Sequence, residues 1–150
     1  MKDFQFKFQS LLNYRRYRRN LCGIYLAEVL VKDRDLVSQR GSLERDRHDQ
    51  LDELRDLSRE GDVNIDRSAS RRYFAGQLTG EMQLVDDNRS LIAQQLDLCR
   101  QALSKADQDV KVLEKLEEKQ REVFRYDEER HEANELEEVW MSGHLREYTR

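Results

Sequence analysis

The residues that could most readily do chemistry are the cations and aromatic rings of the tract Tyr14-Arg15-Arg16-Tyr17-Arg18-Arg19. Guanidinium groups bind phosphates and aromatic rings stack on bases, so these residue types suit nucleic-acid binding. On a helix, however, six consecutive side chains surround the axis instead of lining one groove. The tract therefore favours a protein-binding or charge-complementary face. An ordinary solvated face and nucleic-acid binding are the alternatives.

Metal-binding and nucleophilic chemistry are not indicated. His48, His131 and His144 lie far apart, and no two have the i, i+4 spacing of a helical zinc site. Cys22 and Cys99 form neither a CxxC pair nor a disulfide framework. The sequence contains no GxxxxGK[ST] phosphate loop and no GxSxG nucleophile motif. We therefore expect no enzyme activity, no metal, no cofactor and no small-molecule ligand.

The composition indicates long solvated helices. Of 150 residues, 39% are charged, 37% are hydrophobic and none is proline. Because an interior proline costs about 3 kcal/mol, its absence permits uninterrupted helices. Residues 1–20 contain six Lys or Arg and one acid, whereas residues 114–150 contain twelve acids and seven bases. With no signal peptide and no apolar run of about 18–20 residues, the chain is predicted to be soluble and cytoplasmic.

An apolar seam in alternating steps of four and three residues runs from Leu78 to Leu113. Ten of its eleven positions are apolar, and Arg89 is the exception. A 3.5-residue repeat of this length is typical of a left-handed coiled coil. The seam consists of Leu78, Met82, Val85, Arg89, Ile92, Leu96, Cys99, Leu103, Ala106, Val110 and Leu113.

A weaker seam of the same spacing lies upstream, with eight apolar residues in fourteen positions. Four of its polar positions are arginines, whose long stems can cover a seam while their charged groups reach water. This pattern also predicts a helix. Its positions are Leu12, Arg15, Arg19, Cys22, Leu26, Val29, Asp33, Leu36, Arg40, Leu43, Arg47, Gln50, Leu54 and Leu57.

A chain reversal is predicted between the two seams. Gly61 and Asn64 suit a turn, and Asp66 or Ser68 can cap the helix that follows. We therefore predict an all-α fold, an antiparallel two-helix coiled-coil hairpin that forms an elongated rod and a single domain over residues 1–150. The first arm covers about 4–60, the turn about 61–66 and the second arm about 67–148.

The register of this hairpin predicts an unpartnered C-terminal overhang. If paired residue numbers add to about 127, Phe4 lies level with Val123, and an overhang begins at about residue 124. The second seam weakens at the same place, because its continuation through Glu117 and Gln120 is mostly polar. The register also separates Cys22 and Cys99 by about 9 Å along the axis, too far for a disulfide. We expect both to be reduced seam residues.

Apolar groups near the open end are candidate anchors. Phe4, Phe6 and Phe8 alternate, which indicates an extended lead-in or a frayed first turn. Their rings either cap the open end or bind a partner. The overhang contains the one tryptophan of the chain, which favours an intermolecular site over a folded-back cap. This residue, Trp140, is accompanied in the overhang by three aliphatic residues: Leu136, Val139 and Leu145.

Three segments resemble the FliJ family of flagellar export proteins. The opening FQFKFQSLLNYRRYRR is similar to the start of the family, and GDVNIDRSASRRYFAGQL resembles its turn and second-helix entry. VLEKLEEKQREVF, followed by HEANELEEVW, resembles the C-terminal signature. The segments occur in the family order and span nearly the whole chain. The sequence departs from the signature at Glu137, where aspartate is common, and residues after Trp140 match nothing specific.

The resemblance implies a non-enzymatic stalk or chaperone component of the flagellar type III export machine, similar in shape to the coiled-coil part of the rotary ATP synthase gamma subunit. Its implied partners are the hexameric export ATPase, whose ring it would enter, and an export-gate membrane protein, with export chaperones in addition. It would help to couple ATP and proton-motive energy to export, and so support flagellum biogenesis and chemotaxis. Its implied location is peripheral, at the cytoplasmic face of the inner membrane.

Carried over by position, the resemblance assigns the ATPase side to the open end and the gate side to the turn end. The ATPase-binding residues would be Leu12, Tyr14, Arg15, Arg16 and Arg19 on the first arm, with Glu132, Asn134, Glu135 and Leu136 on the second. The gate-binding residues would be Tyr73, Phe74 and Leu78. Three alternatives stay open: an injectisome stalk protein, a generic coiled-coil scaffold that dimerises through its seams, and a nucleic-acid binder acting through Arg15, Arg16, Arg18 and Arg19.

Overall fold

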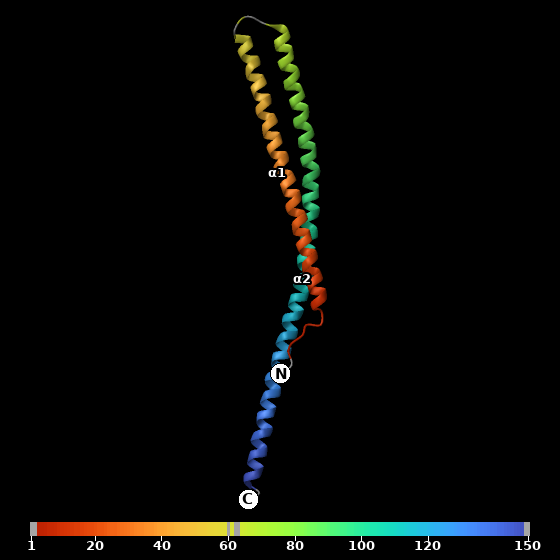
Figure 1. Cartoon of the computed structure of the whole chain (residues 1–150), viewed down its shortest axis with the longest axis vertical. Helices are drawn as coiled ribbons and strands as arrows, with labels where there is room; N and C mark the ends of the chain where they lie inside the picture. The colour runs from red at the N-terminus through yellow and green to blue at the C-terminus, as the bar shows by residue number, and fades with distance from the viewer. Residues whose placement is uncertain (1–2, 60, 62–63, 149–150) are drawn as a thin grey trace. The chain divides into compact units, whose positions relative to one another are not determined.

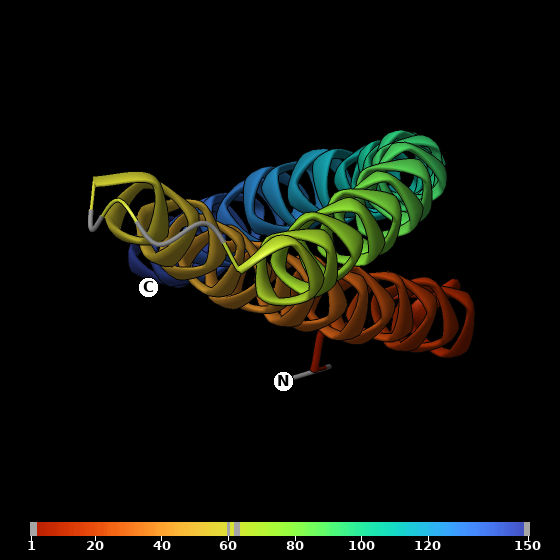
Figure 2. The ribbon, with the colours of Figure 1, turned by 90° about the horizontal axis from the view of Figure 1, so that it is seen from above.

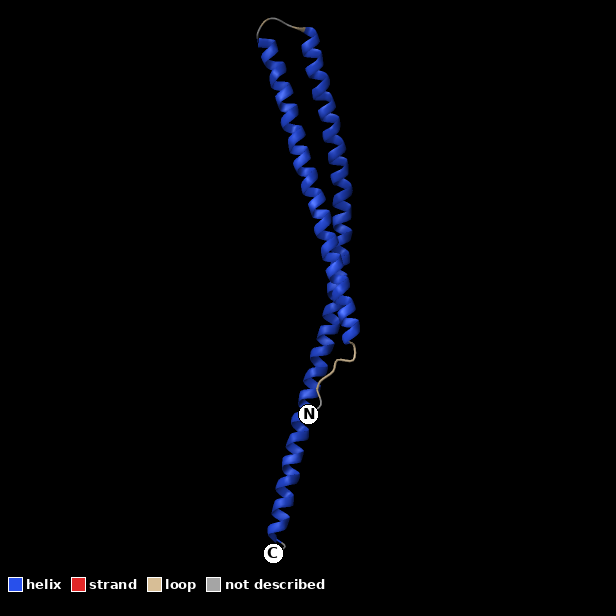
Figure 3. Ribbon diagram, in the orientation of Figure 1, coloured by secondary structure: helices blue, strands red, loops and turns tan. Residues whose placement is uncertain are grey.

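The computed structural model consists of two long helices packed antiparallel, which confirms the prediction of an all-α helical hairpin (Figure 1). Helix α1 covers Gln9–Arg59 and helix α2 covers Ile65–Tyr148. The structure describes residues 3–59, 61 and 64–148, and within this part of the chain there is no strand (Figure 3). Residue 60, the predicted end of the first arm, and residues 62 and 63 of the predicted turn lie outside the described residues.

The N-terminal lead-in is extended, and α1 begins at Gln9, five residues later than the predicted arm. A turn at residues 7–8 precedes the helix, in which Gln9 N donates to Phe6 O at 3.1 Å. Leu12 N then donates to Phe8 O at 2.9 Å, as in the first turn of a helix. Phe6 is thereby directed into the interior, where it is buried. An extended lead-in is one of the two forms that the alternating phenylalanines predict.

Helix α2 begins at Ile65, two residues earlier than predicted, because Asn64 caps it. The Oδ1 of Asn64 accepts a hydrogen bond from Arg67 N at 3.2 Å, and its carbonyl accepts one from Ser68 N at 3.0 Å. This is the arrangement by which an N-cap residue satisfies the first amides of a helix. The predicted caps Asp66 and Ser68 therefore lie inside the first turn. Gly61 has a φ of 72°, a left-handed conformation that glycine adopts without strain.

The chain divides into two compact units, which are described separately. The turn unit comprises Leu21–Ser104 and contains the end of α1 and the start of α2, which lie side by side in Figures 1 and 2. Its buried residues come from both helices: Val29 on α1, and Ala75, Met82, Val85 and Leu96 on α2.

The terminal unit comprises Met1–Asn20 and Lys105–Arg150. Its core contains Phe6 and Leu12 from the N-terminal segment and Val110 and Leu113 from α2. Phe4 and Leu116 are partly buried against this cluster. The lead-in therefore belongs to the hydrophobic core instead of projecting into solvent.

The burial pattern confirms both predicted seams. Every position of the seam from Leu78 to Leu113 is buried or half-buried, as are all fourteen positions of the α1 seam. In the continuation of the α2 seam, Glu117, Gln120 and Phe124 are half-buried. The seam positions after Phe124 are exposed: Asp127, His131, Asn134 and Glu138.

Candidate protein-binding surfaces

The basic residues predicted at the open end contact α2 within the terminal unit. Arg15 donates from Nη1 to the backbone oxygen of Asp109 at 3.0 Å. Arg16 forms an ion pair with Glu114 at 3.1 Å, and Arg19 lies 3.7 Å from Asp107. All three side chains keep part of their surface in solvent. They therefore hold the two segments together and still present cationic surface.

The other two first-arm residues of the predicted ATPase site differ in accessibility. Tyr14 is exposed, so its ring and hydroxyl can meet a partner. Leu12 is 0% exposed and packs in the core with Phe6, Val110 and Leu113. In this structure, Leu12 supports the surface from beneath, and its side chain is not part of it.

A charge cluster sits beside these arginines. Lys111 Nζ lies 2.8 Å from Asp107 Oδ2, and Arg19 approaches the other carboxylate oxygen, Oδ1. The hydrogen bond from Lys111 has the largest effect and lowers the pKa of Asp107; desolvation opposes it, and attraction to Lys111 and Arg19 lowers the pKa further. The same hydrogen bond raises the pKa of Lys111. The cluster therefore stays ionised throughout the neutral range.

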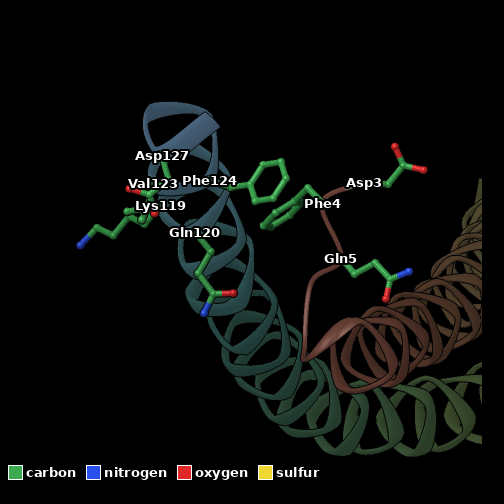
Figure 4. A pocket seen from close by; sticks show the side chains of 8 residues that line it. All are labelled: Asp3, Phe4, Gln5, Lys119, Gln120, Val123, Phe124 and Asp127. Carbon is green, nitrogen blue, oxygen red and sulfur yellow. The ribbon is translucent and has the colours of Figure 1, made fainter. Parts of the chain in front are cut away.

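The lead-in adds an aromatic groove that the sequence analysis did not identify. The ring centroids of Phe4 and Phe124 lie 5.7 Å apart (Figure 4). Arg121 Cζ lies 4.8 Å from the centroid of the Phe4 ring. An open groove of about 790 Å³ borders this contact. The sequence signal was present in the register, which placed Phe4 level with Val123, one residue from its observed partner. The groove is lined by Asp3, Phe4, Gln5, Lys119, Gln120, Val123, Phe124 and Asp127.

Beyond this groove, α2 continues as a C-terminal extension, defined here as residues 125–148. All side chains from Glu129 to Arg146 are exposed, including Glu132, Asn134 and Glu135 of the predicted ATPase site. Residues 127–138 contain seven acids and one arginine, so the extension is strongly acidic. Apolar residues remain in this setting, since Leu136 is 70% and Trp140 is 65% exposed. Their i, i+4 spacing places both on one helix face.

The Trp140 ring stacks on His144 with 4.6 Å between the ring centroids. Val139 and Met141 are exposed on either side of the tryptophan in the sequence. Exposed large apolar side chains are typical of protein-binding surfaces, so these residues are a candidate site.

The structure does not bring the two halves of the predicted ATPase site together. Leu12 packs at the level of Val110 and Leu113, whereas Glu132 lies nineteen residues beyond Leu113 on α2. At 1.5 Å per residue, this separation is about 28 Å along the helix. A single partner that uses both halves must therefore extend along the terminal unit.

The predicted gate residues lie in the turn unit near the start of α2. Tyr73 and Phe74 are exposed, with 6.1 Å between their ring centroids, and Gln77 Nε2 donates to the Tyr73 hydroxyl at 2.8 Å. Leu78 is half-buried as a seam residue. Phe74 and Leu78 border an open groove of about 420 Å³ between the two helices. The remaining lining residues are Asp46, Asp49, Gln50, Glu53, Gln77 and Glu81.

The described part of the chain contains neither a metal-binding cluster nor a membrane-spanning helix. No group of three or more His, Cys, Asp or Glu residues there could hold a metal ion. Neither helix, as far as it is described, has a stretch long and apolar enough to span a bilayer. Cys22 and Cys99 are free and half-buried.

Comparison with protein families gives a match over nearly the whole chain. Residues 4–148 match the family described as "Flagellar FliJ protein". The match includes the lead-in, both helices and the C-terminal extension. No curated protein and no solved structure matches the chain significantly.

Proposed function

The chain belongs to the flagellar FliJ family and is a component of the flagellar export apparatus, and on that premise we propose that it is a non-enzymatic stalk. The stalk binds the ring of the export ATPase with its terminal unit and the export-gate membrane protein with its turn unit. It helps to couple ATP and proton-motive energy to export through these two contacts. The observation that carries this proposal is the family match over residues 4–148.

The proposed ATPase surface has a basic part and an acidic part. The basic part is formed by Tyr14, Arg15, Arg16 and Arg19, and its arginines contact Asp109, Glu114 and Asp107 of α2. The acidic part is formed by Glu132, Asn134, Glu135 and Leu136, on a helix whose described side chains beyond Glu128 are all exposed. Charged surfaces of this kind favour rapid, reversible association.

The proposed gate surface is the exposed aromatic pair Tyr73 and Phe74, with Leu78 beneath it. Aromatic side chains contribute a large share of the binding energy at protein interfaces. The acidic groove beside Phe74 fits a partner segment that carries basic residues. Through this contact the protein would be peripheral at the cytoplasmic face of the inner membrane, where export chaperones are further partners.

A binding experiment tests the ATPase contact. The immobilised chain is incubated with the purified export ATPase, and retention is compared between wild type and the double variant L136A/W140A. Because both side chains are exposed, the variant should keep its helicity and lose ATPase binding by tenfold or more. V112A, another exposed apolar residue of α2, is the matched control and should bind as wild type does. Equal retention of wild type and L136A/W140A removes the extension from the proposed interface.

A second binding experiment addresses the gate contact. The variant Y73A/F74A should bind the export-gate protein more weakly while its affinity for the ATPase is unchanged. L136A/W140A should show the opposite pattern. If both variants reduce the affinity for both partners equally, the assignment of one partner to each unit is wrong.

A further inference from the structure

The turn unit carries a second heptad pattern on the outer surface of α2. Leu84, Leu91 and Leu98 are spaced by seven residues and are 64%, 60% and 66% exposed. Between them, Asn88 and Gln95 occupy the positions four residues after each leucine, and Ala102 follows Leu98 in the same way. All six side chains are exposed. We call this set of residues, 84, 88, 91, 95, 98 and 102, the leucine stripe.

The leucine stripe is distinct from the hairpin core. Met82 and Val85 are buried against α1, yet Leu84 between them is exposed, because each residue turns the helix by about 100°. The same relation holds for exposed Leu98, two positions after buried Leu96. Helix α2 therefore has two faces of 3.5-residue periodicity, of which α1 covers one.

We propose that the leucine stripe is a self-association surface, on which the α2 helices of two copies of this chain pack parallel and in register. The spacing from Leu84 to Asn88 is four residues and from Asn88 to Leu91 is three, as between the core positions of a coiled coil. In parallel two-stranded coiled coils leucine is typical of the d-type positions, and a polar residue such as Asn88 at an a-type position specifies register and oligomer state at a cost in stability.

The chemistry of the stripe favours a second copy over an unrelated protein. None of its six residues is charged, although 39% of the chain is. A surface without charge offers nothing for an oppositely charged partner to recognise, but it can meet its own copy without like-charge repulsion. A two-fold interface of this kind requires a self-complementary patch.

In parallel, in-register packing, each residue of the leucine stripe faces the identical residue of the second copy. Each leucine then meets the same leucine of the second copy, and the Asn88 and Gln95 side chains can hydrogen-bond to their counterparts. In the antiparallel arrangement, a-type positions meet d-type positions, so each leucine would oppose an amide or Ala102. The parallel pairing therefore buries more apolar surface and leaves fewer amides without partners.

The stripe is short, so the association should be weak and reversible. From Leu84 to Ala102 it covers eighteen residues, or about 27 Å of helix. Interfaces between stable partners bury about 800 Å² on each side, and a single helix face of this length is smaller. The expected state is a monomer at low concentration and a dimer at high concentration.

Cysteine cross-linking tests the arrangement in the full chain. In a C22S/C99A background with unchanged helicity, L84C, L91C and L98C are each oxidised and analysed without reductant. The proposal predicts disulfide-linked dimers for all three variants. S90C, an exposed position one residue before Leu91 and turned away from the stripe, is the control and should remain monomeric. Linkage of L91C alone, no linkage of any leucine variant, or equal linkage of S90C would overturn the proposal.

Sedimentation equilibrium provides a readout that needs no oxidation. Wild type should have a mass of 18.0 kDa at low concentration and approach twice that mass at high concentration. L84Q/L91Q/L98Q should remain monomeric with wild-type helicity, and V31Q/V37Q, which alters exposed apolar residues of α1, should dimerise normally. A wild type that is monomeric throughout, or a triple variant that dimerises equally well, contradicts the proposal. These results do not depend on binding to the ATPase or the gate.

Discussion

Arg89 and Asp33 face each other across α2 and α1, with Arg89 Nε donating to Asp33 Oδ1 at 3.2 Å. Arg89 is the one polar residue in the seam from Leu78 to Leu113, and Asp33 occupies a seam position of α1. The positive charge of Arg89 in the α2 seam is therefore paired with the negative charge of Asp33 in the α1 seam. Because any shift of register would separate the two groups, the pair helps to specify how the helices align.

This pair should show measurable coupling in a double-mutant cycle. R89A and D33A should each lower the free energy of unfolding, with a coupling of about 0.5–1 kcal/mol because both side chains are partly exposed. R89L/D33L should be more stable than either alanine variant, since apolar residues then fill both seams. Urea denaturation measures these values. Strictly additive effects of R89A and D33A would show that the pair does not stabilise the hairpin.

Leu12 should be a major determinant of stability in the terminal unit. Its side chain is fully buried, so L12A should reduce the free energy of unfolding by about 2–4 kcal/mol. L11A, at the exposed neighbouring position, should cost less than about 1 kcal/mol. Chemical denaturation compares the two. If both variants lose equal stability, the packing of the lead-in on α2 is not as described.

The contact between Phe4 and Phe124 should fasten the lead-in to α2. F4A and F124A should each cost about 1–2 kcal/mol, and the double variant should cost less than their sum because the ring contact is lost once. V123A, an exposed neighbour of Phe124, should have little effect. Hydrogen exchange of residues 6–12 provides a local measurement. Unchanged protection there in F4A would contradict this role of the aromatic contact.

The Asp107 cluster gives a pH prediction with a definite sign. Because Lys111 and Arg19 lower the pKa of Asp107 below its ordinary value of 3.8, the folded state favours the carboxylate. The resulting stabilisation is present above pH 3.8 and is lost as the pH falls through the lower pKa of the folded state. A carboxyl NMR titration should show this pKa rising toward the ordinary value in K111Q. R16Q, which alters an arginine paired with Glu114 instead, is the control; an unchanged titration in K111Q would contradict the assignment.

The sequence was informative where periodicity determines burial. In the predicted register, the numbers of two residues that face each other add to about 127. The observed contacts Phe4–Phe124 and Arg40–Asp86 give sums of 128 and 126. The loss of burial after Phe124 was likewise predictable, because the seam becomes polar there. A 3.5-residue repeat defines which face is covered, so such features follow from counting residues.

Features that depend on local hydrogen bonds could not be predicted in this way. Asn64, Asp66 and Ser68 are all competent N-caps, and only the backbone geometry at Ile65 selects Asn64. The family resemblance places Leu12 in a partner-binding site. Its burial depends on how the lead-in packs Phe6 against α2. The cation–aromatic contact between Arg121 and Phe4 has no periodic signal in the sequence.

Secretion of flagellar subunits tests the central claim most directly. A flagellated strain that lacks its own copy of this protein is supplied with wild type, L136A/W140A or V112A at equal protein levels, and the subunits released into the medium are measured. If the protein acts in export through its exposed extension, L136A/W140A should release at least tenfold less than wild type, and V112A should match wild type. Wild-type secretion by L136A/W140A would contradict the account.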